Sequence, residues 1–192
     1  MDVMVWTRQH ISVIEDLEQT GRYVPTRQRI LKDIDHHDLV LIAYDWLREQ
    51  VPADKKPKDA DYPIWLSPTE AATMIPSPTH PILELVIDAE LITPININKW
   101  GAILNFSYIP LDEADERRHR DLIDRYGLSD AKIVMSRFYP ELKQKIIDSW
   151  RRLFDPTISL GGDAYYGLIW EIDRDWIRRI IRSKDDQEVA CD

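Results

Sequence analysis

Strand patterns and helical stripes follow one another irregularly along this chain, and their order constrains the fold more than any single motif. Alternating apolar residues predict a strand over 3–9. Ser12-x-x-Glu15 has the spacing of a capping box for a helix over 13–20, and Gly21 is typical of a helix end. Because no regular strand–helix–strand alternation follows, we expect an α+β fold with a mixed or antiparallel sheet and flanking helices.

The remaining elements are predicted by the same criteria. Apolar residues at helical spacing indicate the strongest helix of the first half over 38–50, and four prolines make 68–81 a loop. Asp173 is expected to cap a last helix that holds Trp176, Ile177, Ile180 and Ile181. Length favours one domain over 1–182, followed by a loose tail over 183–192. The other expected strands are 62–67, 82–87, 90–93 and 164–172, and the other expected helices are 98–105, 112–126 and one beginning at Pro140.

Composition limits the classes of function. The formal net charge of −9 argues against nonspecific binding of duplex nucleic acid, because phosphates are neutralised by clustered Lys and Arg. The single cysteine, Cys191, cannot form an internal disulfide and fits a reducing compartment. No segment approaches the ~20 apolar residues that a membrane span needs. We therefore expect a soluble, cytoplasmic protein with no membrane contact.

Familiar catalytic motifs are absent from the sequence. There is no glycine-rich phosphate loop, no His-Glu-x-x-His helix, no cysteine pair and no Gly-x-Ser-x-Gly turn. The cluster from Asp35 to Asp38, which includes His36 and His37, lacks a second group of ligands at a suitable spacing. It is interpreted as the start of a helix rather than as a metal site.

One carboxylate and seven tryptophans remain as candidates. Glu171 lies in the apolar segment 169–172, where a charge is costly unless it faces a cleft or meets a partner. It either lies on the solvated face or pairs with an arginine, or it acts as a catalytic acid or an anchor for ribose hydroxyls. Five of the tryptophans lie on apolar stripes and are expected in the core, whereas Trp6 and Trp46 are candidates for the wall of a nucleotide pocket.

Several short segments, spread in order over nearly the whole chain, resemble a bacterial family described only as a domain of unknown function. The segments are Trp6-Thr7-x-Gln9, Tyr44-x-Trp46-Leu47-x-x-Gln50, Tyr62-Pro63-Ile64-Trp65, Asn98-x-Trp100-x-x-x-Leu104-Asn105 and Trp170-Glu171-Ile172.

A more distant similarity links the chain to ADP-ribosyltransferases. Along the chain, these enzymes have a first strand, a helix, a glycine and a late strand that supplies a catalytic Glu. In this sequence, Thr7 stands where their first strand often carries His. The resemblance implies that Glu171 stabilises the positive charge that develops on the ribose of NAD. It further implies that Thr7, Arg8 and Gln9 hold NAD in the cleft that Glu171 faces, and that Tyr23 stacks on the nicotinamide. The pyrophosphate would be bound by the basic group Arg22, Arg27, Arg29 and Lys32.

The resemblance also implies a biological setting, namely the toxin of a toxin–antitoxin or phage-defence system, with an antitoxin protein as a partner. Its target would be an intracellular RNA, DNA or protein. Two alternatives are left open by the residues: a nonenzymatic Trp-rich module that binds a protein, and a hydrolase that processes nucleotides or RNA.

Overall fold

The computed structural model describes residues 1–28, 37–162 and 164–183. The chain divides into two compact units. Unit 1 comprises residues 1–37, 47–94 and 166–192, and unit 2 comprises residues 38–46 and 95–165. The single domain expected over 1–182 stays a prediction, and the expected tail lies outside the described residues from 184 onward.

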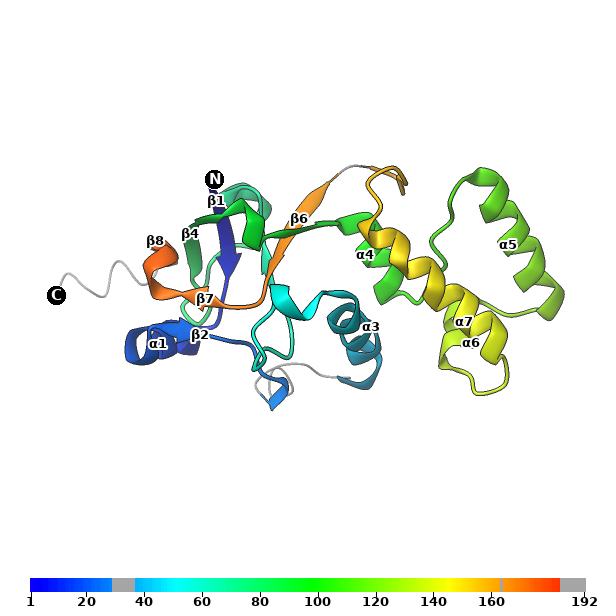
Figure 1. Ribbon diagram of the computed structural model, residues 1–192, viewed down its shortest axis with the longest axis horizontal. Helices are drawn as coiled ribbons and strands as arrows, with labels where there is room; N and C mark the ends of the chain where they lie inside the picture. Colours follow the sequence, from blue (N-terminus) through cyan, green and yellow to red (C-terminus); the bar gives the residue numbers. More distant parts are fainter. Residues whose placement is uncertain (29–36, 163, 184–192) are drawn as a thin grey trace. The chain divides into compact units, whose positions relative to one another are not determined.

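Unit 1 is built on short antiparallel pairings, among them those of β1 (blue), β4 (green) and β8 (orange-red) in Figure 1. The central strand β4 pairs with β1 on one side and β8 on the other. A second sheet has the order β3-β6-β5, and β2 pairs with β7. Together with six α-helices among the described residues, these sheets confirm the expected α+β class. The strands are β1 (Asp2–Arg8), β2 (Arg22–Tyr23), β3 (Ile64–Leu66), β4 (Ile82–Asp88), β5 (Thr93–Asn96), β6 (Tyr165–Ile169), β7 (Ile172–Asp173) and β8 (Ile177–Ile181).

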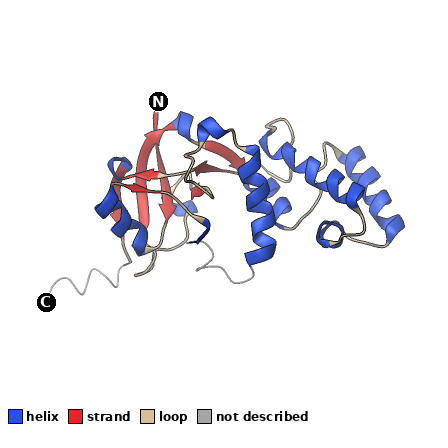
Figure 2. Cartoon of the chain, turned by 60° about the horizontal axis from the view of Figure 1, so that its bottom comes forward, coloured by secondary structure: helices blue, strands red, loops and turns tan. Residues whose placement is uncertain are grey.

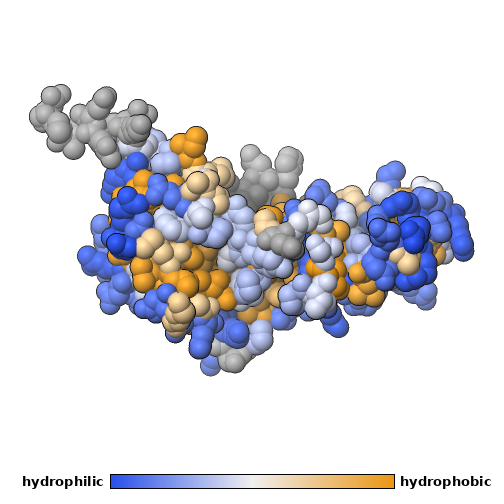
Figure 3. Space-filling model, turned by 90° about the horizontal axis from the view of Figure 1, so that it is seen from above, coloured by the Kyte–Doolittle hydropathy of each residue, from blue (hydrophilic) through white to orange (hydrophobic). Residues whose placement is uncertain are grey.

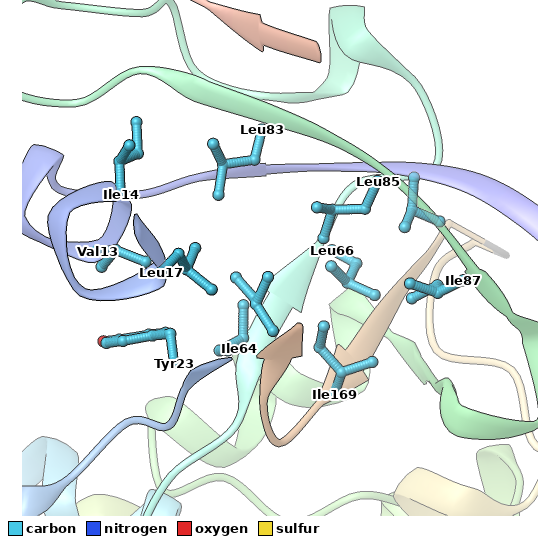
Figure 4. Packing of buried hydrophobic residues seen from close by; sticks show 12 residues of the cluster. Val13, Ile14, Leu17, Tyr23, Ile64, Leu66, Leu83, Leu85, Ile87 and Ile169 are labelled. Atoms are coloured by element: carbon cyan, nitrogen blue, oxygen red, sulfur yellow. The ribbon is translucent and has the colours of Figure 1, made fainter. Parts of the chain in front are cut away.

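The core of unit 1 forms between helix α1 (Ile11–Thr20) and the strands. Val13, Ile14 and Leu17 recur at helical spacing, so they share one face of α1. Figure 4 shows this face turned toward Leu83 of β4. Burial of each such aliphatic side chain contributes about 1.5–3 kcal/mol to stability, so the α1 face is a main source of the stability of unit 1.

The start of α1 differs from the expected capping box. His10 is the N-cap, and its ring nitrogen Nδ1 accepts from the backbone N–H of Ser12 at 3.2 Å. Ser12 therefore lies in the first turn, where its hydroxyl contacts the His10 ring at 2.8 Å. The end of the helix is as expected: Gly21 takes the left-handed conformation, with φ 76°, and its N–H donates to the Leu17 carbonyl.

The expected C-terminal helix was wrong. Asp173 caps only a 3-10 turn (Arg174–Trp176), and Ile177–Ile181 is the strand β8, which lies against β4. Because Ile177, Ile180 and Ile181 are β-branched, they suit a pleated sheet as well as a helix, and β4 supplies the partner for the backbone. The expected strand over 90–93 is likewise a 3-10 turn (Ala89–Leu91) followed by β5.

Unit 2 is helical (Figure 2). Its centre is Trp150, which is fully buried and meets Trp46 edge to face at 5.5 Å between ring centroids. Phe106 stacks on the same indole, whose N–H donates to the Ser107 carbonyl. The helices are α3 (His37–Gln50, of which 38–46 fall in this unit), α4 (Ile97–Leu104), α5 (Glu113–Tyr126), α6 (Asp130–Met135) and α7 (Pro140–Ser149), which runs into a 3-10 segment (Trp150–Phe154). Over the described ranges, no helix combines the length and apolar character of a membrane span.

Candidate functional site

Glu171 lies in a break between two strands of unit 1. The strand expected over 164–172 stops at Ile169 and resumes as β7 at Ile172, so Trp170 and Glu171 leave the regular pairing. Trp170 is buried, whereas the Glu171 side chain is 33% exposed. Ile172 is the register partner of Tyr23, and this pairing brings the Gly21-x-Tyr23 segment to the acidic residue.

Arg22 holds the Glu171 carboxylate. Its Nε donates to Glu171, while its two terminal nitrogens donate to the two carboxylate oxygens of Asp59 at 2.9 and 3.1 Å. The hydrogen bonds that Arg22 donates, first to Asp59 and then to Glu171, raise the pKa of its guanidinium above its ordinary value. The hydrogen bond from Arg22 in turn lowers the pKa of the Asp59 carboxyl. The cluster is reachable from solvent, because the Arg22 side chain is 40% exposed.

A second cation lies beside the same break. The Lys56 ammonium is 5.3 Å from the centroid of the Trp170 ring and donates to the Arg48 carbonyl. Burial first, and then the charge of Arg48, lower the pKa of Lys56 below its ordinary value. The segment that carries Glu171 therefore lies beside two basic side chains, Arg22 and Lys56.

The three residues expected at the end of β1 are engaged within their own part of unit 1. Thr7 is almost fully buried, and its hydroxyl accepts from the Gln9 side chain at 2.8 Å. Arg8 donates to the Ile75 carbonyl at 3.1 Å and to the Ser77 hydroxyl at 3.3 Å. Within the described ranges, no hydrogen bond or ion pair joins Thr7, Arg8 or Gln9 to Glu171.

Tyr23 and Arg27 occupy different environments. The Tyr23 ring is buried in the core of unit 1, against the face of α1 (Figure 4). Arg27 is exposed, and its backbone N–H donates to the Asp61 carboxylate at 2.9 Å. Arg29 and Lys32 of the expected basic group lie outside the described residues, as do Asp35 and His36 of the cluster considered for metal binding.

The sequence reasoning missed one carboxylate, Glu84 on β4. Its side chain is only 7% exposed and accepts from Arg179 of β8 at 2.8 Å, which lowers the pKa of Glu84. An open cavity of about 420 Å³ lies beside it, lined by Met4, Glu84, Arg178 and Arg179. The signal that selected Glu171, a single acid within an apolar strand, applies equally to Glu84.

A second missed cluster lies in unit 2, where the expected helix over 112–126, which is α5, buries one stripe of side chains. Asp115, His119 and Ile123 are buried and recur every four residues, a spacing that was visible in the sequence. The Asp115 carboxylate accepts from the Tyr108 hydroxyl at 2.9 Å and from Arg152 at 3.0 Å. Although burial by itself raises the pKa of Asp115, hydrogen bonds from the Leu111 amide and Tyr108, with the charge of Arg152, bring it below its ordinary value.

All seven tryptophans lie in the described ranges, and each is buried or half-buried. Trp46, Trp100, Trp150 and Trp170 are core residues. None of the seven is an exposed anchor, so their main role in this structure is packing.

Comparisons with known proteins identify the family and no more. The family model for the domain of unknown function DUF3841 matches residues 4–178. This chain therefore belongs to that family, as the short tryptophan-containing segments predicted. No curated protein and no solved structure matches it. Within the described ranges, no group of three or more His, Cys, Asp or Glu side chains is arranged to hold a metal ion.

Proposed function

We propose that this chain is an intracellular ADP-ribosyltransferase that uses NAD, with Glu171 as its catalytic carboxylate. The observation that carries the proposal is the junction of β2 and β7. It joins two of the segments on which the resemblance rests, and it leaves the Glu171 carboxylate in contact with both Arg22 and solvent.

The chemistry suits a carboxylate in this position. In the transfer, the bond between nicotinamide and the anomeric carbon of the ribose breaks, and nicotinamide leaves with the bonding electron pair. A nucleophile of the target attacks that carbon, forms the new bond to it and releases its proton to solvent. Positive charge develops on the ribose between these events, and a carboxylate that binds the ribose hydroxyl stabilises it where it forms. The bond from Arg22 fixes the orientation of Glu171 in advance, which lowers the cost of reaching that arrangement.

The roles of the other predicted site residues are assigned according to whether their side chains are exposed or buried. Arg27 is exposed, and with Arg8 and Gln9 it is assigned to holding NAD. Thr7 is buried, so its role is to hold Gln9 through their hydrogen bond. Tyr23 is assigned to supporting the β2–β7 junction from the core.

The proposed setting is a toxin–antitoxin or phage-defence system, in which an antitoxin protein restrains the enzyme. The target is an intracellular macromolecule. The net charge of −9 favours a protein over a nucleic acid, since phosphates are repelled by a negative surface.

The test is incubation with labelled NAD and a mixed cell extract. We compare the native chain with Glu171→Gln, and with Asp175→Asn as a control that removes one negative charge from an exposed residue nearby. Label transfer by the native chain and Asp175→Asn, but not by Glu171→Gln, is the expected result. Equal labelling by all three would remove Glu171 from the mechanism. Nuclease and protease treatment of the labelled product then identifies the class of target.

A further inference from the structure

Unit 2 exposes a cluster of large side chains at the turn between α6 and α7. Phe138, within this turn, is 86% exposed, more than any other Phe, Tyr or Trp among the described residues. Met135 at the end of α6 and Tyr126 at the end of α5 are each about half exposed. The Tyr126 ring meets the Tyr139 ring edge to face at 5.9 Å between centroids, which joins the end of α5 to the start of α7. We call Tyr126, Met135, Phe138 and Tyr139 the turn cluster.

Hydrogen bonds of the turn itself hold the Phe138 backbone in place. Ser136 ends α6, and its N–H donates to the Ile133 carbonyl at 3.1 Å. The Ser136 hydroxyl then accepts from the Phe138 N–H at 3.0 Å, and Pro140 begins α7 two residues later. Because the turn is already ordered, less conformational entropy is lost when a partner binds to Phe138.

Basic side chains surround the turn cluster, and they differ from those elsewhere on α5. The outer surface over most of α5 is hydrophilic (right-hand end of Figure 3), but Arg117, Arg118 and Arg120 each pair with a carboxylate three or four residues earlier. The cations around the turn cluster form no ion pair within the described ranges of the chain. Each is next to a member of the cluster or one helical turn from it. They are Arg125, Lys132, Arg137 and Lys143.

Acidic residues do not neutralise this surface. In the segment 125–143, Asp130 is engaged at both oxygens: Oδ1 contacts His119 Nε2 at 2.8 Å, and Oδ2 accepts from the Tyr108 amide at 2.8 Å. The exposed carboxylates are Glu141, in the first turn of α7, and Asp124, which precedes Arg125. Positive charge therefore predominates around the turn cluster, although the whole chain has a net charge of −9. A negatively charged partner complements this surface.

The mixture of side chains favours a polypeptide over a nucleic acid. Exposed Phe, Tyr, Met and Arg are the residue types enriched in protein interfaces, where an aromatic side chain commonly provides the anchor. A single-stranded nucleic acid needs a basic groove that follows its backbone, whereas here four cations are interleaved with Met135 and Glu141. The strongly acidic remainder of the chain also repels a long polyanion. A short acidic segment with an apolar residue meets neither obstacle.

We propose that the turn cluster is a docking surface for an acidic segment of a partner protein. Phe138 and Met135 pack against an apolar residue of that segment, and the neighbouring guanidinium groups donate to its carboxylates, which arginine does through two parallel hydrogen bonds. The surface lies within unit 2 and involves neither Glu171 nor NAD, so it is independent of the proposed transferase activity.

The experiment selects short random peptides, displayed on phage, for binding to the full native chain and against binding to Phe138→Ser. We expect the retained peptides to carry Asp or Glu beside an aromatic or aliphatic residue. Synthetic copies of the retained peptides are then titrated by fluorescence anisotropy. Replacing their acids by Asn or Gln, or their apolar residue by Ser, should weaken binding about tenfold or more, and added salt should weaken it further.

Matched variants separate the turn cluster from general stickiness and charge. Arg137→Gln should weaken binding, whereas Arg117→Gln, which removes the same charge from an ion-paired site, should not. Ile75→Ser is the apolar control, because Ile75 of unit 1 is also 86% exposed. Thermal unfolding shows that each variant is folded. Failure to retain any peptide, retained peptides without acids, or equal losses in the control variants would overturn the proposal. So would oligothymidylate binding, vesicle binding with phosphatidylserine, or self-association that Phe138→Ser abolishes.

Discussion

The guanidinium of Arg22 donates to the carboxylate of Glu171, a residue 149 positions later in the chain. Two short strands make this contact possible, because β2 and β7 pair directly beside it. The same guanidinium is held from its other side by both carboxylate oxygens of Asp59. The orientation of the Arg22 guanidinium is therefore set by both Asp59 and Glu171, and Arg22 in turn sets the orientation of the Glu171 carboxylate.

The Arg22→Gln variant should lower the rate of label transfer much more than it lowers the free energy of unfolding. Without the guanidinium, Glu171 loses its fixed orientation, and we expect the kcat of label transfer from NAD to fall about tenfold or more while KM changes less. The free energy of unfolding should change by less than about 1 kcal/mol, since exposed ion pairs contribute little. Arg22→Lys should restore part of the rate. Asp175→Asn, which removes an exposed carboxylate outside the Arg22–Glu171 contact, serves as the control, and an equal loss in that variant would argue against a specific role for the Arg22–Glu171 pair.

Gly167 of β6 and Gly101 of α4 should respond in opposite directions to replacement by alanine. A Cβ on Gly167 would lie 2.7 Å from Cγ2 of Ile92 and 3.2 Å from Cβ of Leu66, so the packing must shift, at a cost of about 1–3 kcal/mol. A Cβ on Gly101 meets nothing within 4 Å, and alanine is the better helix former by about 1 kcal/mol. Urea unfolding curves measure both changes. Gly167→Ala as stable as the native chain would contradict this packing.

Local signals in the sequence predicted most elements, because capping, proline stops and apolar stripes act within a few residues. The helix over 38–50, the end at Gly21 and the charged helix before Gly127 were all visible in this way. Ile177–Ile181 was mispredicted because its apolar spacing fits a helix, and only the neighbouring strand β4, almost a hundred residues earlier, makes it β8.

The candidate site was less predictable than the fold. Glu171 stood out as a charge in an apolar segment, but its partner Arg22 lies far away in the sequence, and Asp59, which also binds Arg22, lies in a loop with no signal of such a contact. His119 was hidden in a helix dominated by charged residues, and its partner Asp130 belongs to the next helix. Such relationships arise from tertiary packing, which short-range patterns do not encode.

Asp115→Asn should destabilise unit 2 in a way that depends on pH. The carboxylate accepts from Leu111, Tyr108 and Arg152, and losing its charge should cost about 2–3 kcal/mol at neutral pH. Because the folded-state pKa of Asp115 lies below its ordinary value, this stabilisation is present above that value and is lost as the pH falls through the folded pKa. The difference in unfolding free energy between native and variant should therefore shrink below about pH 4. A difference that stays constant from pH 7 to pH 3 would contradict it.

The most direct test of the central claim is the rate at which nicotinamide is released from NAD. Purified native chain and Glu171→Gln are compared in the presence of cell extract, with thermal unfolding of each chain showing that both are folded. The account predicts release by the native chain and a loss of about 10²–10³-fold in the variant, the usual effect of removing one group that stabilises developing charge. Release at the same rate by both chains, or by neither, would contradict it.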